Sequence, residues 1–173
     1  MPVTEPLIDE DALRSRIQEL GKQIRADYGP DTPITAIGVL KGSIVFMSDL
    51  VRQIPGPVEL EFLGVSSYEG TESTGQVRIT HDLHGSIKDK HVLVVEDIVD
   101  TGLTLSYLRD LLSVREPASL KVVALLDKPS RRTSPVDVEY IGFEIPNAFV
   151  VGYGLDLDER YRNVPYVGLY EGE

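Results

Sequence analysis

The stretch that determines the fold of this chain runs from His91 to Leu105 and reads HVLVVEDIVDTGLTL. Its first part, His91 to Val95, is apolar and rich in β-branched residues, which predicts a strand buried on both faces. Carboxylates and then small hydroxylated residues follow, and leucines recur at helical spacing from Leu105 onward. This order of strand, acidic turn, glycine-containing loop and helix predicts one unit of an α/β fold.

The acidic turn holds three carboxylates within five residues, those of Glu96, Asp97 and Asp100. In an open parallel sheet, ligands bind beyond the carboxyl ends of the strands, where these side chains are expected to lie. One such residue is enough to cap a helix, so capping alone does not account for the group. Because carboxylates repel a phosphate, the group is expected to face the hydroxyls of a sugar or a divalent metal.

The loop after the carboxylates combines Gly102 with the hydroxyls of Thr101 and Thr104. The first turn of the following helix has backbone N–H groups without partners and carries the positive end of the helix dipole. A phosphate fits there, with the threonines as additional donors and the glycine allowing close approach of the backbone. Together, the carboxylates and the loop predict a site for a phosphorylated sugar.

The composition is that of a soluble globular protein of one domain, with 173 residues of which 42% are apolar. The absence of cysteine excludes disulfides and cysteine chemistry. No apolar run approaches the roughly 20 residues of a membrane helix, and the acidic N-terminus does not resemble a signal peptide, so a cytoplasmic location is expected. A net charge of −11 without a dense basic cluster argues against a nucleic-acid binder.

Further patterns predict the rest of the fold. Residues 1–8 are expected to form a flexible arm, and a helix capped by Asp9 is expected to end at Tyr28. A second helix is expected from Ile44 onward, ending before Pro55. Strands are expected over residues 34–40, 58–65, 77–83, 120–127, 138–144, 149–156 and 166–170.

The segment VVEDIVDTGLT, residues 94–104, resembles the phosphoribosyl-diphosphate-binding signature of the type I phosphoribosyltransferases. With the rest of the chain, including Lys128 and the segments GFEIP and FVVGYGLD, it resembles the hypoxanthine-guanine branch of that family. The resemblance covers residues 7–172 and implies an α/β fold with a twisted, mainly parallel sheet flanked by helices. It also implies a single domain over residues 1–173, with a small hood formed by residues 145–173 and part of the N-terminus.

The resemblance gives the acidic turn and its loop specific roles. Glu96 and Asp97 would hold the ribose hydroxyls, in part through Mg²⁺ and water. Residues 100–104 would wrap the 5′-phosphate, and Asp100 would also act as general acid or base at N7 of a purine. Leu103 stands where some relatives carry a lysine, which leaves the phosphate to backbone amides and hydroxyls.

A second loop, Lys41-Gly42-Ser43, follows the strand that ends at Leu40. By itself it is typical of an ordinary strand-to-helix turn with a solvated lysine. The resemblance implies instead that backbone groups of Lys41, Gly42 and Ser43 bind pyrophosphate, with a cis peptide between Leu40 and Lys41. Arg162 matches an arginine that binds the same group, and its guanidinium geometry suits that partner.

The purine site is implied by residues far apart in the sequence. Lys128, just beyond a buried strand, would donate to O6 of the base and select a 6-oxopurine over adenine. Phe149 would stack on the purine ring, and the backbone of Val150 would meet the edge of the base. Asp156 would contact both the base and the Mg²⁺ ion.

A polar stretch, SSYEGTESTG at residues 66–75, predicts a surface loop. The resemblance implies that Ser67 and Tyr68 in this loop form part of a lid over the reacting centre. Such a lid would exclude water from a reactive sugar cation.

These inferences predict an enzyme that transfers a 5-phosphoribosyl group from phosphoribosyl diphosphate to N9 of hypoxanthine or guanine, with Mg²⁺. Relatives form dimers or tetramers, so a homodimer or homotetramer is expected, without a nucleic-acid or membrane partner. Two alternatives stay open. One is a nucleotide-sensing, RNA-binding regulator on the same fold, which the acidic net charge disfavours. The other is a xanthine-guanine phosphoribosyltransferase.

Overall fold

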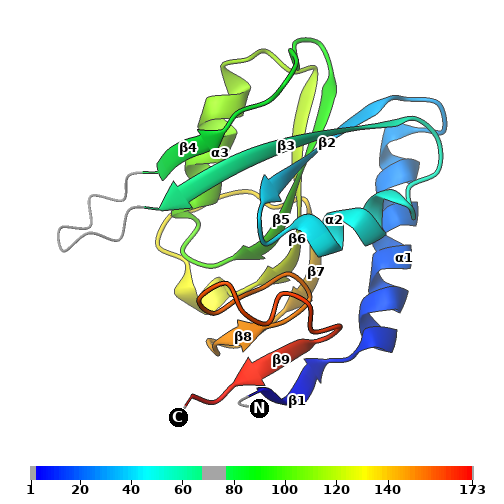
Figure 1. Ribbon diagram of the computed structural model, residues 1–173. Coiled ribbons are helices and arrows are strands. Elements are labelled where there is room, and N and C mark those ends of the chain that lie inside the picture. The colour runs from blue at the N-terminus through cyan, green and yellow to red at the C-terminus, as the bar shows by residue number, and fades with distance from the viewer. Residues whose placement is uncertain (1–2, 68–76, 173) are drawn as a thin grey trace.

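The computed structural model describes residues 3–67 and 77–172 and contains a six-stranded sheet (Figure 1). The strand order is β4-β3-β2-β5-β6-β7, and only β4 runs antiparallel to its neighbour. The expected α/β class with a mainly parallel sheet is therefore confirmed. The strands are β2 (Ile34–Leu40), β3 (Val58–Ser67), β4 (Val77–His81), β5 (His91–Val99), β6 (Ser119–Asp127) and β7 (Tyr140–Glu144).

Helices cover both faces of this sheet (Figure 1). The sheet has an apolar core on each face, and successive residues of β5 point into opposite cores. Leu93 and Val95 pack on one face with α1 (Glu10–Tyr28) and α2 (Ile44–Val51). Val92 and Val94 pack on the opposite face with α3 (Leu103–Ser113). The β-branched run thus forms a strand buried on both faces, as predicted. A short 3₁₀ turn, η1 (Pro129–Arg131), follows β6.

The first helix begins and ends as the sequence predicts. The side chain of Asp9 accepts a hydrogen bond of 2.8 Å from the backbone N–H of Ala12, which satisfies an amide at the helix start. The helix ends at Tyr28, and Gly29 continues the chain with a φ of 90°, a conformation that favours glycine.

A second sheet of three antiparallel strands lies at the lower end of the molecule in Figure 1. Its strands are β1 (Val3–Ile8), β8 (Val150–Val151) and β9 (Val167–Tyr170), in the order β1-β9-β8. The prediction of a flexible arm over residues 1–8 was wrong from residue 3 onward, because β9 offers β1 an edge with which to pair. The N- and C-terminal segments are thereby joined, and we call this sheet with residues 152–166 the hood.

Two other strands differ from their predicted extent. β5 continues through Glu96 and Asp97 to Val99, so these carboxylates belong to the end of the strand and not to a turn after it. Pairing with β6 continues to Val99, opposite Asp127, which keeps this extension in the sheet. The segment 149–156 forms only the two-residue β8, since glycines with positive φ then turn the chain.

No helix in the described ranges has both the length and the apolar character needed to span a membrane.

Candidate active site

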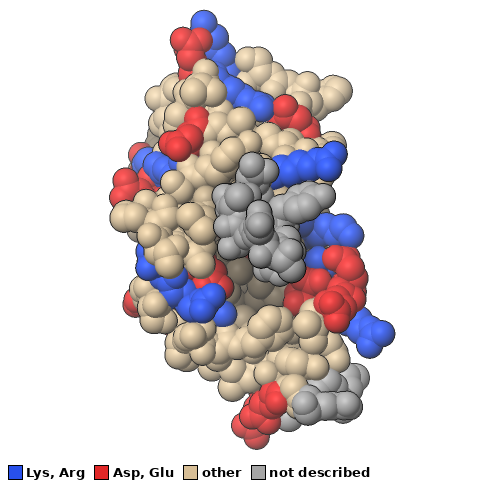
Figure 2. Space-filling view, turned by 90° about the vertical axis from the view of Figure 1, so that its left-hand side faces the viewer, with Lys and Arg blue, Asp and Glu red and all other residues tan. Residues whose placement is uncertain are grey.

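A cavity of about 400 Å³ lies at the carboxyl ends of β2 and β5 and extends to the hood. Figure 2 shows a hollow on this face of the molecule, with acidic and basic side chains on both sides of it. Nine of the predicted site residues line the cavity: Gly42, Glu96, Asp97, Asp100, Thr101, Gly102, Thr104, Asp156 and Arg162. The tertiary structure thus brings together three segments that are far apart in the sequence.

Glu96 and Asp97 form the floor of the cavity at the end of β5. Glu96 is 6% exposed, and burial raises the pKa of its carboxyl well above the usual range, with a further increase from the neighbouring Asp97. Burial also raises the pKa of Asp97, although the backbone N–H of Ile98 and the charge of Arg162 oppose that change. The pair therefore lacks full charge compensation from the protein.

This carboxylate pair fits a divalent cation. Among the described residues, no group of three or more His, Asp or Glu side chains is arranged to hold a metal by itself. Mg²⁺, however, commonly binds one or two protein carboxylates and completes its shell with water and substrate phosphates. A cation beside Glu96 and Asp97 would offset the cost of burying their charges.

Replacing Glu96 with glutamine is expected to raise the free energy of unfolding by about 1 kcal/mol at neutral pH without metal. The folded state holds the Glu96 proton more tightly than the unfolded chain, because folding raises the pKa of this carboxyl. Wild-type stability therefore falls as the pH rises above the usual range of a glutamate, and the glutamine variant lacks this dependence. Thermal unfolding between about pH 5 and about pH 8 measures the difference.

The matched control is Glu144→Gln, which removes an exposed glutamate at the end of β7. Its unfolding temperature should follow the wild-type pH profile. Parallel profiles for Glu96→Gln and the wild type would contradict the prediction.

The loop between β5 and α3 is held in place by backbone contacts. The carbonyl oxygen of Thr101 accepts hydrogen bonds from the N–H groups of Thr133 (2.9 Å) and Ser134 (3.0 Å). Gly102, with a φ of 87°, precedes the helix, and a Cβ there would lie 2.4 Å from the Ser134 carbonyl oxygen. Only glycine fits this position, and Thr104 and Leu105 of the first turn of α3 line the cavity.

Asp100 projects from the same loop and is 42% exposed at its side chain. Its carboxylate accepts a hydrogen bond of 3.0 Å from Nε of Arg131, and its backbone oxygen accepts one of 3.1 Å from Arg132. Arg132 also pairs with the buried Asp127. Sequence reasoning missed both arginines, since nothing in the polar segment that contains them signals a contact with the acidic turn.

The loop after β2 meets the acidic pair directly. The peptide between Leu40 and Lys41 is cis, as the resemblance implies. A Cβ at Gly42 would lie 1.8 Å from a carboxylate oxygen of Asp97, so the backbone of Gly42 packs directly against the Asp97 side chain. Ser43 is fully buried and does not line the cavity, and its hydroxyl and its backbone N–H both donate to the Val39 carbonyl oxygen, at 2.7 and 3.4 Å.

Arg162 reaches the cavity from the hood. Its guanidinium donates to the Gly154 carbonyl oxygen (2.7 Å) and to Glu159 (2.9 Å), and it lies 3.4 Å from Asp156. Glu159 also accepts a hydrogen bond of 2.9 Å from the ammonium group of Lys41. No motif in the sequence singles out Glu159, whereas the fold makes this residue a link between both predicted pyrophosphate-binding segments.

The other predicted residues lie outside the lining of this cavity. Lys128 is 7% exposed, and its backbone N–H donates to the carbonyl oxygen of Val99, a residue of the cavity wall, at 2.9 Å. Phe149 is 51% exposed, with its ring edge-to-face against Tyr170 at 5.8 Å, which leaves room for a planar ligand to stack. Val150 begins β8 and is buried.

Three further predicted residues also lie outside the cavity lining or outside the described residues. Leu103 is half exposed at the first position of α3 and does not line the cavity. Ser67 is the last residue of β3. Tyr68, the other predicted lid residue, lies outside the described residues.

Comparison with known proteins gives the family. The model of the phosphoribosyl transferase domain matches residues 7–158 of this chain. The chain belongs to the phosphoribosyltransferase family. The matched residues include the acidic pair, the loop 100–104 and the Lys41 loop.

Individual phosphoribosyltransferases are similar over almost the whole chain. The hypoxanthine phosphoribosyltransferase of Haemophilus influenzae is 54% identical over 165 residues, which cover 94% of this chain and 92% of that protein. A crystal structure of a hypoxanthine phosphoribosyltransferase from Staphylococcus aureus has a TM-score of 0.93 at 47% identity, covering 98% and 92% of the two chains. The bifunctional protein TilS/HprT of Listeria innocua is 48% identical over 172 residues. The aligned region covers 99% of this chain but only 26% of that longer protein.

Proposed function

We propose that this protein transfers the 5-phosphoribosyl group of phosphoribosyl diphosphate to N9 of hypoxanthine or guanine, yielding IMP or GMP and pyrophosphate. The observation that carries the proposal is the convergence of the loop 100–104, the Gly42 loop and Arg162 on one buried carboxylate pair. The relative from Haemophilus influenzae, named hypoxanthine phosphoribosyltransferase, supports the choice of base.

In this proposal, the loop and the acidic pair bind the sugar phosphate. Backbone amides of the first turn of α3 and the hydroxyls of Thr101 and Thr104 bind the 5′-phosphate. Glu96 and Asp97 orient the ribose hydroxyls. These two carboxylates and Asp156 would hold Mg²⁺, which supplies positive charge to the departing pyrophosphate when bound.

In the proposal, the pyrophosphate leaving group is bound by the loop after β2 and by Arg162. Departure of pyrophosphate leaves positive charge on the ribose ring, so the reaction accelerates when the negative charge on the leaving oxygens is stabilised. Backbone groups of Lys41, Gly42 and Ser43 and the guanidinium of Arg162 provide this stabilisation. Because Glu159 pairs with both Lys41 and Arg162 in the free protein, pyrophosphate would replace its carboxylate as their partner.

The purine base is bound beside the loop 100–104. Phe149 stacks on the purine, the backbone of Val150 contacts its edge, and Lys128 donates to O6. Asp100 accepts or returns the proton at N7 while N9 attacks the ribose, as general acid–base catalysis requires. Arg131 engages only Oδ1 of this carboxylate, so Oδ2 remains available for the contact with N7.

Three accompanying features belong to the proposal. Ser67 and Tyr68 form part of a lid that excludes water during transfer. The protein works in the cytoplasm as a homodimer or homotetramer. It is one domain over residues 1–173, with the hood contributing Asp156 and Arg162 to the site.

A spectrophotometric assay with phosphoribosyl diphosphate and Mg²⁺ tests the function, with hypoxanthine, guanine, xanthine and adenine offered separately. We expect nucleotide from hypoxanthine or guanine, no nucleotide from adenine, and loss of activity on addition of a chelator. Faster turnover of xanthine than of hypoxanthine would identify a xanthine-guanine enzyme. Absence of turnover with every base would contradict the proposal and favour the regulatory alternative, which an RNA-binding titration would then test.

A further inference from the structure

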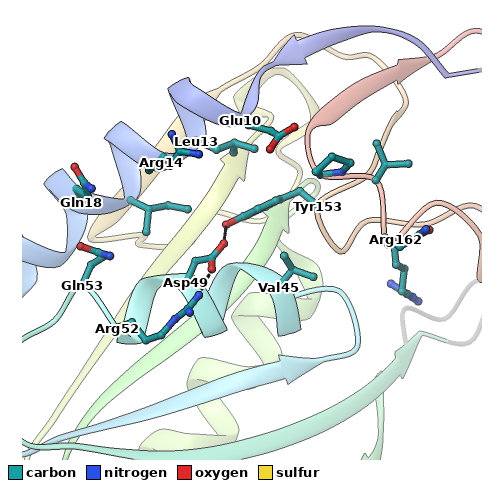
Figure 3. Close-up of a pocket in the computed structure, with 14 residues that line it drawn as sticks. Glu10, Leu13, Arg14, Gln18, Val45, Asp49, Arg52, Gln53, Tyr153 and Arg162 are labelled. Carbon is teal, nitrogen blue, oxygen red and sulfur yellow. Dashed lines mark hydrogen bonds and ion pairs between the residues drawn. The ribbon is translucent and has the colours of Figure 1, made fainter.

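The hood is tied to α2 by a buried tyrosine. Tyr153 follows β8 and is 7% exposed, and its hydroxyl donates to the carboxylate of Asp49 on α2. Figure 3 shows the tyrosine ring extending across the space between the hood and α2 toward Asp49. Burial and the carboxylate raise the pKa of the Tyr153 hydroxyl, so it remains a donor throughout the physiological pH range.

The α2 end of this contact is rigidly connected to the proposed pyrophosphate loop. Ser43 precedes the helix, and its carbonyl oxygen accepts a hydrogen bond of 2.8 Å from the N–H of Met47. Its buried hydroxyl fixes the same residue to the end of β2. Because a helix of eight residues moves as a rigid unit, a shift in the position of Asp49 also shifts the loop 41–43.

The hood end is connected just as closely to Arg162. The N–H of Tyr153 donates to the Val164 carbonyl oxygen at 2.7 Å, and the N–H of Gly154 donates to the Arg162 carbonyl oxygen at 2.9 Å. The Arg162 guanidinium returns to the Gly154 carbonyl oxygen at 2.7 Å. The backbone on either side of Tyr153 therefore fixes the position of the arginine.

Gly154 also places the hood directly against the loop. A Cβ at Gly154 would lie 2.4 Å from the carbonyl oxygen of Gly42, and the φ of 97° at this residue favours glycine as well. The distance between the Gly42 backbone and the Arg162 guanidinium thus depends on how the hood sits on α2. These are the groups that bind pyrophosphate in the proposed function.

The hydrogen bond between Tyr153 and Asp49 borders a second cavity. A cavity of about 670 Å³, separate from the substrate cavity except for Arg162, lies between α1, α2 and the hood (Figure 3). Tyr153 and Asp49 both line it, so their hydrogen bond spans a region where side chains do not fill the space. Tyr153 and Leu155 of the hood share one apolar core with Phe46 and Leu50 of α2, and the Tyr153–Asp49 hydrogen bond adds a directional contact to this packing.

We infer that Tyr153 and Asp49 are positioning residues, which set the separation of the Gly42 loop and Arg162 and thereby the affinity for the pyrophosphate group. The inference rests on the proposed function. Neither residue touches the substrate cavity, and each acts through the segment that carries it. Their loss should therefore affect pyrophosphate and phosphoribosyl diphosphate, which carry this group, and leave the purine base unaffected.

The test compares Tyr153→Phe with Tyr140→Phe as a matched control. Tyr140 is also buried, and its hydroxyl also donates to an aspartate, Asp27, at 2.6 Å, but this contact joins β7 to α1. Each variant loses one hydroxyl and one tyrosine–aspartate hydrogen bond. Calorimetry with magnesium pyrophosphate gives the affinity, and the assay gives KM for phosphoribosyl diphosphate and for hypoxanthine.

Tyr153→Phe is expected to weaken pyrophosphate binding about fivefold and to raise KM for phosphoribosyl diphosphate similarly, with KM for hypoxanthine changed less than about twofold. Tyr140→Phe is expected to lower the unfolding temperature without changing any of these constants. Asp49→Asn keeps an acceptor oxygen for the tyrosine and should behave as the wild type, whereas Asp49→Ala should reproduce Tyr153→Phe.

Other outcomes overturn the inference. Equal pyrophosphate affinity in the wild type and in Tyr153→Phe, or equal losses in both tyrosine variants, would leave the contact a purely structural one. If Tyr153→Phe does not fold, an Asp49→Ala protein with unchanged affinity would have the same meaning. A wild-type protein that binds no pyrophosphate and turns over no base would overturn the proposed function together with this inference.

Discussion

Replacing Asp100 with asparagine is expected to lower kcat about 100- to 1,000-fold, whereas KM for phosphoribosyl diphosphate changes less than about threefold. Asparagine is isosteric but cannot take or return the N7 proton, so the variant loses only the transition-state contribution. The amides of α3 and the backbone contacts of Thr101 remain, and these are the groups proposed to bind the phosphate. Steady-state kinetics with both substrates varied measures the two effects separately.

Asp110→Asn is the matched control for this variant. Asp110 lies on α3, is exposed, and does not line the cavity, so its replacement makes the same chemical change outside the site. We expect wild-type constants for it. If Asp100→Asn lost turnover and affinity for phosphoribosyl diphosphate in equal measure, Asp100 would be a binding residue and its role at N7 would be wrong.

Replacing Gly42 with alanine is expected to raise KM for phosphoribosyl diphosphate about 100-fold, because misplacement of binding groups by about 1 Å has effects of this size. A Cβ at Gly42 would lie 1.8 Å from a carboxylate oxygen of Asp97 and 2.7 Å from its Cγ, so either the loop or the carboxylate must move. Both belong to the proposed site, one to its pyrophosphate side and the other to its ribose and metal side. Substrate kinetics and pyrophosphate binding report the displacement.

Gly85→Ala serves as the control, because a Cβ at Gly85 would lie 3.6 Å from Glu61, an ordinary contact distance, on the surface. It should keep wild-type kinetics and stability. A Gly42→Ala protein with unchanged KM would show that the close approach of Gly42 to Asp97 is not required for binding.

The central unit of the fold could be predicted because its signals are local. The β-branched run, the carboxylates and the glycine of residues 91–105 specify strand, turn and helix within a few residues of one another. The same holds for α1, whose cap at Asp9 and terminator at Gly29 are read directly from neighbouring positions. The extent of β5 was underestimated, since pairing with β6 keeps Glu96 and Asp97 in an extended conformation that acidic residues do not favour by themselves.

The hood shows the limit of local patterns. Residues 3–8 have the composition of a loose arm, and β8 has only two residues, yet both find partners on β9. Strand pairing between segments at opposite ends of a chain depends on edges that exist only after folding. Only the family resemblance, and not composition or periodicity, indicated that the N-terminus takes part.

The sequence by itself determined the α/β class, the loop proposed to bind phosphate and the identity of the carboxylates, because each depends on residues adjacent in the chain. Only the tertiary structure decided which side chains meet. Asp100 with Arg131, Lys41 with Glu159, and Tyr153 with Asp49 are separated by 31, 118 and 104 positions. Such contacts arise from how sheet, helix and hood pack together, and no pattern of propensity or spacing encodes them.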